Sequence, residues 1–240
     1  MGRILAISDI HGQYAMLVTL LEKIELQPDD QLIFMGDYID RGPQSKEVLE
    51  KVLSLQQTQQ AKVLMGNHEA IMLRAFTAKH SKPWAHWVGV CGGIETLASY
   101  GLTVEDFDTN NLPLLNQLPP KHALRQHLQQ IEMMGYYVAY DDVVFVHAGV
   151  DPILPIEQTP IATLLWIRQE FHQQYQGNKT IVFGHTPTFR LHADESTDVY
   201  FGTNRIIGID GGATFGGQLH CLDWTTNRVY SINAKSCIAP

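Results

Sequence analysis

The sequence predicts an α/β protein whose first third forms alternating strands and helices with a parallel sheet. Short apolar runs rich in Val, Ile and Phe recur along the 240 residues, and each ends abruptly in glycine or a polar residue. Amphipathic segments lie between the first of these runs. Runs this brief suit strands that are covered on both faces, and alternation of strands with helices favours parallel pairing.

Six apolar runs are predicted to be strands. They span residues 3–8, 31–35, 62–65, 143–146, 180–183 and 206–209. Beyond the last run, the glycine pairs at 211–212 and 216–217 indicate turns between closing β segments.

Two helices are predicted between the first three strands. Apolar residues recur there with helical spacing, at Met16, Leu17, Leu20, Leu21 and Ile24. The same pattern begins at Val48, Leu49, Val52 and Leu53, after the turn at 41–43. One apolar face of this kind predicts a helix that packs against a sheet.

The middle of the chain has a different character. Between about 77 and 135 it contains two tryptophans, the pairs Gly92-Gly93 and Pro119-Pro120, and a helical pattern at Leu124, Leu128 and Ile131. We interpret this segment as a mostly helical insertion in a single domain that spans residues 1–240.

Composition excludes several functional classes. The formal charge of -8 opposes binding to a nucleic-acid polymer, because such a surface repels the phosphate backbone. Cys91, Cys221 and Cys237 form no C-x-x-C pair, which favours free thiols in a reducing compartment. The sequence has no secretory signal and no apolar run of about 20 residues, so we expect a cytoplasmic protein without a membrane contact or an obligate partner.

Polar side chains follow five of the predicted strands. They occur in the segments S-D-I-H-G, G-D-Y-I-D-R-G, G-N-H-E, H-A-G and G-H-T, which begin at residues 8, 36, 66, 147 and 184. A single Asp or His after a strand is usually a helix cap or a turn residue. Five together are expected to converge, because loops after parallel strands meet at one edge of the sheet.

The residue types suit a particular kind of metal site. A mixture of carboxylate, amide and imidazole favours Mn, Fe or Zn over calcium. Two ions about 3.5–4 Å apart need a carboxylate that bridges them, and Asp37 in the middle of the set is the natural candidate.

These ordered motifs closely resemble those of the PPP-type metallophosphoesterases, and the resemblance extends over essentially the whole chain. The segments G-G-I-E-T-L-A-S-Y-G and L-W-I-R-Q-E-F are similar to those of the small bacterial and phage serine/threonine protein phosphatases. The resemblance implies the calcineurin-like fold, a β-sandwich of two mixed sheets flanked by helices.

The resemblance also implies a role for each site residue. Two divalent metal ions, expected to be Mn²⁺ with Fe or Zn as alternatives, would be held by Asp9, His11, Asp37, Asn67, His147 and His185. Arg41 and Arg168 match the arginines that bind the phosphate, and His68 matches the general acid that Asp40 orients. A hydroxide that bridges the metals would attack phosphorus directly.

Three functions compete at this stage. The first is a phosphatase acting on phosphoserine or phosphothreonine proteins, or on small phosphoesters. The second is a symmetrical dinucleoside tetraphosphatase, although such sequences usually carry Ala in place of Asp40 and Asp in place of Glu69. The third is a catalytically silent module that binds phosphorylated ligands through its metals.

Other polar residues are expected to be structural. Seven histidines outside the strand ends are predicted to lie on the surface or in packing contacts: His80, His86, His122, His127, His172, His192 and His220. Cys91 and Gly211 depart from the family pattern, and both departures are expected to affect substrate contacts more than chemistry.

Overall fold

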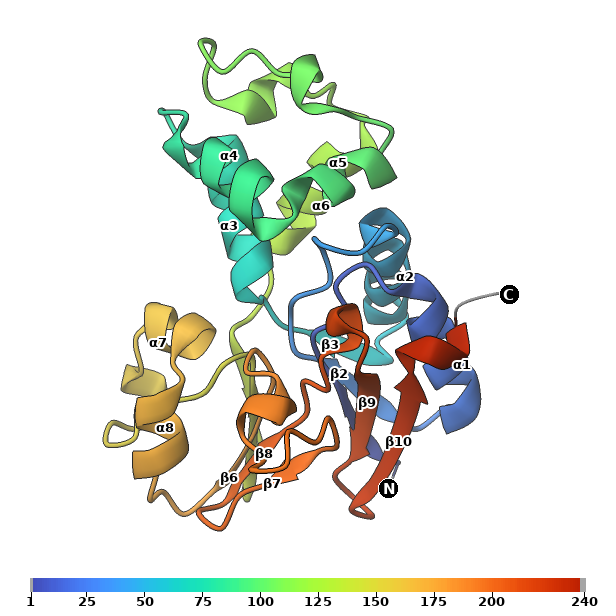
Figure 1. Cartoon of the computed structure of the whole chain (residues 1–240), viewed down its shortest axis with the longest axis vertical. Helices are drawn as coiled ribbons and strands as arrows, with labels where there is room; N and C mark the ends of the chain where they lie inside the picture. Colours follow the sequence, from blue (N-terminus) through green and yellow to red (C-terminus); the bar gives the residue numbers. More distant parts are fainter. Residues whose placement is uncertain (1, 238–240) are drawn as a thin grey trace.

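The computed structural model describes residues 2–237 and contains two five-stranded sheets that pack face to face (Figure 1). The first sheet has the order β10-β9-β1-β2-β3. Its strands are β1 (Ile4–Ile7), β2 (Gln31–Phe34), β3 (Ala61–Val63), β9 (Gln218–Asp223) and β10 (Arg228–Asn233). The second sheet has the order β4-β5-β6-β8-β7. Its strands are β4 (Tyr137–Ala139), β5 (Val143–Val146), β6 (Thr180–Phe183), β7 (Tyr200–Phe201) and β8 (Ile206–Gly208).

Both sheets are mixed, which confirms the expected sandwich. Strands β1, β2 and β3 pair in parallel, as the sequence pattern predicts, whereas β9 and β10 add to β1 in antiparallel fashion. In the second sheet, β5, β6 and β8 are parallel and the edge strands β4 and β7 are antiparallel. A single parallel sheet therefore describes only the first three strands.

The apolar core has three layers because both faces of each sheet are covered. Ala6 and Ile33 of the first sheet pack with Phe145 and Val182 of the second, and all four side chains are buried. Alternate residues of the first sheet, such as Leu5, point to its outer face and pack under helices. This arrangement explains why the strands are continuously apolar.

Helices cover the outer faces. Helices α1 (Tyr14–Ile24) and α2 (Ser45–Gln57) lie on the first sheet, and each buries the apolar face predicted from its sequence. Helices α7 (Ile161–Trp166) and α8 (Gln169–Gln174) lie on the outer side of the second sheet (Figure 1).

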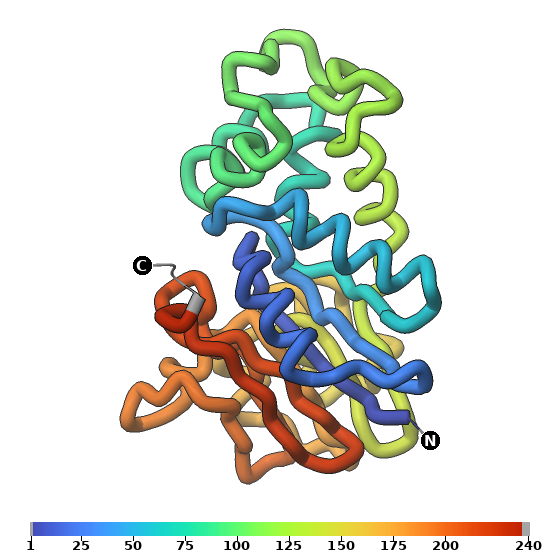
Figure 2. The backbone as a smooth tube through the Cα atoms, turned by 90° about the vertical axis from the view of Figure 1, so that its right-hand side faces the viewer, coloured from blue at the N-terminus to red at the C-terminus, as the bar shows by residue number. Residues whose placement is uncertain are grey.

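A helical segment projects from one end of the sandwich, as Figures 1 and 2 show. It comprises α3 (Asn67–Thr77), α4 (Lys82–His86), a π-helix (Trp87–Cys91), α5 (Gly93–Ser99) and α6 (Ala123–Glu132). Phe76 lies at its centre, with ring centroids 5.4–5.6 Å from those of Trp84, Trp87 and Phe107. These aromatic side chains belong to the same continuous core as α1, α2 and the first sheet.

The two described thiols, Cys91 and Cys221, are buried and form no disulfide, whereas the side chain of Cys237 lies outside the described residues. None of the helices within residues 2–237 has both the length and the apolar character needed to cross a membrane.

Candidate active site

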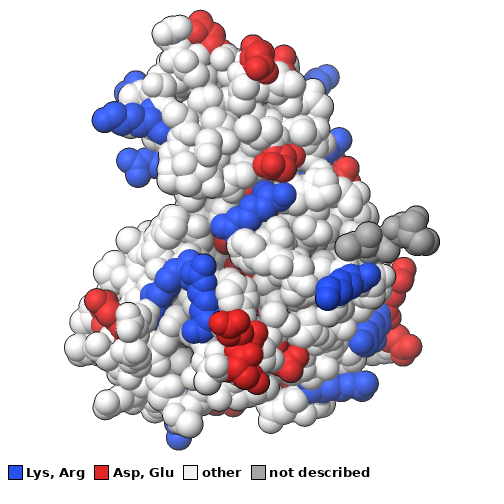
Figure 3. All heavy atoms as spheres, in the orientation of Figure 1, with Lys and Arg blue, Asp and Glu red and all other residues white. Residues whose placement is uncertain are grey.

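A polar cleft opens where the helical segment meets the sandwich, and its volume is about 240 Å³. Figure 3 shows the hollow between these two parts, with blue basic side chains along it. Eight of the predicted site residues line the cleft: Asp9, His11, Asp37, Arg41, Asn67, His68, Arg168 and His185. His147 and Asp40 have no exposed surface, and they contact Asn67 and His68 from behind. The structure therefore brings together every residue predicted for the site.

Sharp turns aim these side chains at one place. Asp9, His11, Asp37 and His185 have φ values of 54°, 45°, 55° and 62°, in the left-handed region that non-glycine residues rarely adopt. Each such residue costs about 1–3 kcal/mol, so the surrounding fold must hold it in place. Four strands end one or two residues before their predicted carboxyl ends at 8, 35, 65 and 209.

Small residues make this convergence possible. A Cβ atom on Gly66 would lie 2.3 Å from the backbone nitrogen of Asp37, and one on Gly184 would lie 2.1 Å from Oδ2 of Asp9. Neither position has room for a side chain, which explains the glycines that flank the site motifs.

Asp37 occupies the centre of the site. Its Oδ1 lies 3.5 Å from Nε2 of His147, and its Oδ2 lies 3.5 Å from Nε2 of His11. Two buried groups of side chains have the spacing of a metal site, and both include this carboxylate: His11 with Asp37 and His68, and Asp37 with His147 and His185. A carboxylate shared in this way is what two adjacent cations require.

The imidazoles are oriented as metal ligands. Nδ1 of His11 donates to the carbonyl oxygen of Ile39 over 2.8 Å, and Nδ1 of His147 donates to that of Met35 over 2.9 Å. The Nε2 lone pairs therefore face the cleft. Burial lowers the pKa of His11 well below its usual value, which keeps this ring in the neutral form that binds metals.

Several nitrogen and oxygen atoms of the site carry lone pairs that could coordinate a metal ion. Nε2 of His185 is buried and has no hydrogen-bond partner among residues 2–237. Nε2 of His147 lies 2.8 Å from Oδ1 of Asn67, so two lone pairs face each other. Burial raises the pKa of Asp9 to about 6, although His185 N and Ser8 Oγ donate to its carboxylate. Such a donor set fits divalent cations.

His68 and Asp40 form a buried pair beside this donor set. Nδ1 of His68 donates to Oδ2 of Asp40 over 2.7 Å. Two side chains of the helical segment hold the same carboxylate: Trp87 donates through Nε1 over 3.0 Å, and Thr96 donates through Oγ1 over 2.7 Å. Burial alone would lower the pKa of His68, but the carboxylates of Asp37 and Asp40 raise it.

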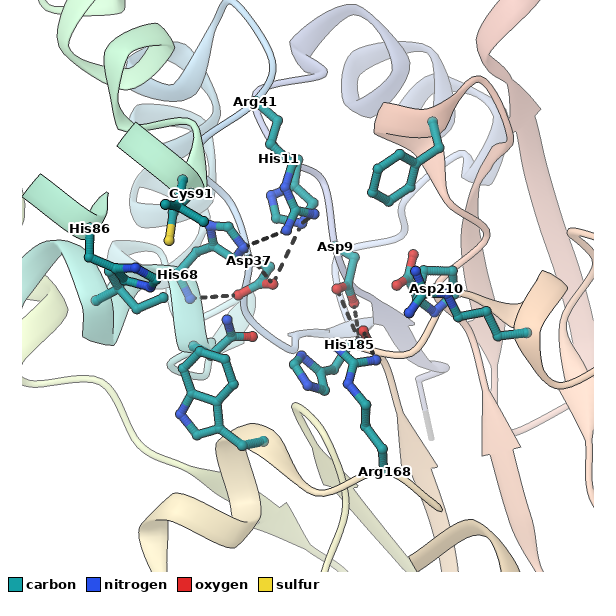
Figure 4. A pocket seen from close by; sticks show the side chains of 17 residues that line it. Asp9, His11, Asp37, Arg41, His68, His86, Cys91, Arg168, His185 and Asp210 are labelled. Atoms are coloured by element: carbon teal, nitrogen blue, oxygen red, sulfur yellow. Dashed lines mark hydrogen bonds and ion pairs between the residues drawn. The ribbon is translucent and has the colours of Figure 1, made fainter. Parts of the chain in front are cut away.

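Two arginines border the donor set on opposite sides (Figure 4). Arg41 donates to Nε2 of His11 over 2.9 Å and to Nε2 of His68 over 2.8 Å. Arg168 donates from Nη1 to the carbonyl oxygen of His185 and to Oγ1 of Thr186. Guanidinium groups in these positions can bind a phosphoryl group by two parallel hydrogen bonds.

Glu69 holds the loops rather than joining either donor group. Its carboxylate accepts hydrogen bonds from the backbone nitrogens of Asp37, Tyr38 and Gly66, at 2.8, 2.8 and 3.0 Å. Burial raises its pKa to about 8. It therefore fixes the turn that carries Asp37 to the start of α3.

Sequence interpretation missed other residues that line the cleft: His86, Trp166, Arg190, Asp210 and Phe215. His86 is exposed, as expected of a surface residue, but it faces the cleft in Figure 4 and is not remote from the site. Asp210 lies two residues after the end of β8, as Asp9 does after β1, so the rule used for the other strand ends would have found it. Nothing in the local pattern marks Arg190, or Trp87 and Thr96 behind Asp40.

The fold and the donor set together define a metal-binding phosphoester hydrolase. The chain belongs to the calcineurin-like phosphoesterase family, whose model matches residues 2–211. It is 29% identical over 263 aligned positions to a Geobacillus protein named bis(5'-nucleosyl)-tetraphosphatase PrpE [asymmetrical], and the match covers 98% of this chain and 95% of the relative.

Solved structures share the fold. A protein provisionally described as a diadenosine tetraphosphatase superposes with a TM-score of 0.67 at 20% identity, covering 97% of this chain and 93% of that one. A serine/threonine protein phosphatase from Saccharomyces cerevisiae superposes with a TM-score of 0.61 at 15% identity, covering 97% and 80%.

Proposed function

We propose that this protein hydrolyses dinucleoside polyphosphates with two divalent metal ions. The observation that carries this proposal is the number of arginine side chains around the metal donor set. Three of them, Arg41, Arg168 and Arg190, line the cleft. A single phosphoryl group bound to two metals has oxygens for about two guanidinium groups, whereas a polyphosphate chain has charge for a third. The name of the Geobacillus relative supports the same substrate class.

The rim of the cleft also suits a nucleotide. Trp166 and Phe215 line it and expose 47% and 60% of their surface, which is unusual for large aromatic side chains. Aromatic faces of this kind stack on nucleobases, because every base offers a π surface. A phosphorylated serine or threonine has no group that would use both rings.

Roles follow for the residues predicted from the sequence. Asp9, His11, Asp37, Asn67, His147 and His185 would hold the two ions, with Asp37 shared between them. When bound, two such ions lower the pKa of a coordinated water and offset charge on the phosphoryl oxygens. Arg41 and Arg168 bind and orient the phosphoryl group. When Arg41 turns from Nε2 of His68 to that group, Nε2 is free to hold a proton for the leaving oxygen.

A phosphoprotein phosphatase is the second candidate, and the pair formed by His68 and Asp40 favours it. A polyphosphate leaves as a stabilised anion and needs little help from an acid. A serine alkoxide is a strong base and requires the proton that a positioned histidine supplies. The raised pKa of His68 is therefore more useful for a monoester. The relative is named as an asymmetrical enzyme, so its name does not favour symmetrical cleavage.

The test compares two substrates on one preparation. Metal-stripped protein is loaded with Mn²⁺, and products from diadenosine tetraphosphate and from a phosphothreonine peptide are separated by chromatography. We expect ATP and AMP from the dinucleotide at the higher kcat/KM, and a smaller loss in His68→Asn with the dinucleotide than with the peptide. Preference for the peptide would establish the second candidate. Bound metal without turnover of either would indicate a silent binding module.

A further inference from the structure

A second hollow of about 390 Å³ adjoins the cleft. Arg168 and Arg190 line both spaces, so these two guanidinium groups lie at their boundary. Residues of α8 form one wall of the second hollow, and Tyr200 at the start of β7 forms another. The site is therefore larger than the metal donor set requires.

The boundary carries positive charge that the protein does not neutralise. Arg190 is exposed and forms no ion pair with a carboxylate within residues 2–237. No Asp or Glu is among the described residues that line the second hollow. In a chain with a formal charge of -8, an acid-free space beside two arginines favours an anion.

The rest of the second hollow offers flat and hydrogen-bonding surfaces. Gln169 and Gln173 line it with amide groups, and Leu191 and Tyr200 line it with apolar surface. The His172 ring also lines it and stacks on Phe183 with centroids 5.1 Å apart. This mixture suits the edge and face of a nucleoside.

We propose that the second hollow binds the part of a dinucleoside polyphosphate that lies beyond the attacked phosphoryl group. Arg190 binds the additional phosphates, and the space next to α8 receives the distal nucleoside. Arg190 thereby distinguishes a polyphosphate chain from a monoester, which ends at Arg41 and Arg168. This inference rests on the proposed function and adds the location of the distal half of the substrate.

The first experiment measures a ratio of specificities. Kinetics with diadenosine tetraphosphate and with p-nitrophenyl phosphate are compared in the wild type, in Arg190→Gln and in Gln173→Trp, which fills the hollow without removing a charge. A lost charged hydrogen bond corresponds to about a 10- to 100-fold change in affinity. We therefore expect Arg190→Gln to lower kcat/KM for the dinucleotide at least tenfold more than for the small ester. Gln173→Trp should shift the ratio in the same direction.

Arg228→Gln is the matched control. Arg228 is an exposed arginine on β10 that lines neither space, so this variant should keep the wild-type ratio. If the wild type cleaves the dinucleotide but Arg190→Gln and Gln173→Trp also keep that ratio, the second subsite is overturned while the proposed function stands.

A second measurement tests the anion subsite even if the protein does not cleave dinucleotides. Inhibition of p-nitrophenyl phosphate hydrolysis by tripolyphosphate and by orthophosphate is measured at a fixed free metal concentration. We expect Arg190→Gln to weaken inhibition by tripolyphosphate about tenfold more than inhibition by orthophosphate. If this holds in a protein that does not cleave dinucleotides, the anion subsite stands and the proposed function falls. Equal weakening for both anions would overturn the subsite.

Discussion

Asp40 has no exposed surface and accepts hydrogen bonds from His68, Trp87 and Thr96. Burial raises the pKa of Asp40, whereas these donors oppose the increase. Because the carboxylate is fixed on both sides, the hydrogen on Nδ1 of His68 is fixed as well. The opposite ring nitrogen is then the one that faces the cleft.

The variant Asp40→Asn tests this arrangement. An amide can turn its NH₂ group toward Nδ1 of His68, which would reverse the tautomer and remove the charge that raises its pKa. General acid catalysis contributes about 10²–10⁴-fold, so we expect kcat for a phosphothreonine peptide to fall about 10²-fold. The effect should be smaller for p-nitrophenyl phosphate, whose leaving group needs no proton. A conservative control is Thr96→Ser, which retains the hydroxyl donor. Equal losses for both substrates would contradict this role.

At the scale of single residues, most of the candidate site was predictable from one expectation, that polar side chains following parallel strands converge at one edge of the sheet. Asp9, Asp37 and His185 follow strands in a way that a linear pattern can reveal. The same rule would have found Asp210, which follows β8. Trp87 and Thr96 could not be predicted, because their contact with Asp40 joins residues 47 and 56 positions apart through tertiary packing alone.

Among the secondary-structure elements, those of the helical segment are stabilised by aromatic packing. Phe76 on α3 is fully buried and touches three other aromatic rings. Among the described helices, α4 and α5 are each too short to be stable alone, since isolated helices need about 12–15 residues. Their stability therefore depends on this cluster.

Phe76→Ala should destabilise the protein by about 3–5 kcal/mol, because it removes a buried ring and leaves a cavity. The free energy of unfolding is measured by urea denaturation. Val90→Ala is the control: Val90 is 74% exposed, and substitutions at such sites usually change stability by less than about 0.5 kcal/mol. A loss below about 1 kcal/mol for Phe76→Ala would show that the cluster is not a core.

Helix α6 carries a pH-sensitive contact. Nδ1 of His127 accepts a hydrogen bond from the hydroxyl of Tyr100, and burial, with the charge of Lys46, lowers the pKa of His127 to about 4. The unfolded chain binds a proton near pH 6.5, whereas the folded chain does so near pH 4. The stability contributed by neutral His127 is therefore complete above pH 6.5 and is lost as the pH falls toward 4.

Replacing His127 by Gln keeps an acceptor for Tyr100 and removes the titration. We expect the free energy of unfolding of this variant to depend less steeply on pH between 6.5 and 4 than that of the wild type. Thermal or urea unfolding across this interval is the measurement. His192→Gln, at a half-buried position in a bend, serves as the comparison. If the free energy of unfolding varies with pH equally in His127→Gln and the wild type, this contact is not the source of the pH dependence.

Elements with strong periodicity were predictable and short edge elements were not. The buried faces of α1 and α2 followed from apolar spacing alone. Strands β4 and β7 are edge strands of only three and two residues, too short to produce a repeating pattern. Their existence depends on pairing with β5 and β8.

At the scale of the whole molecule, the site joins the two sheets. Asp9 and Asp37 follow strands of the first sheet, whereas His147 and His185 follow strands of the second. Metal ions bound by residues from both sheets would link the two sheets at this edge of the sandwich. The mixed pairing itself came from family resemblance, because β1 meets β9 across most of the chain length and no local pattern reveals that contact.

Metal removal should therefore lower thermal stability. A metal ion at a free concentration 100 times its Kd stabilises the folded state by about 2.7 kcal/mol. We expect the Tm to fall when chelator replaces Mn²⁺ and to recover on its return, as followed by calorimetry. Asp37→Asn should greatly reduce this shift, because it changes the shared carboxylate. The same shift in this variant as in the wild type would place the stabilising metal elsewhere.

The contacts of Trp87 and Thr96 with Asp40 also bear on how relatives of this chain diverge. The strand ends and the first residue of α3 supply the donor set, whereas Trp87 and Thr96, which come after α3, hold the partner of His68. A chimera that exchanged residues 78–135 between two family members would exchange these two donors to Asp40 and leave His68 and the proposed metal ligands in place. The side chains that position Asp40 and the metal donor set thus belong to separate parts of the chain, and selection can alter the first while the second is retained.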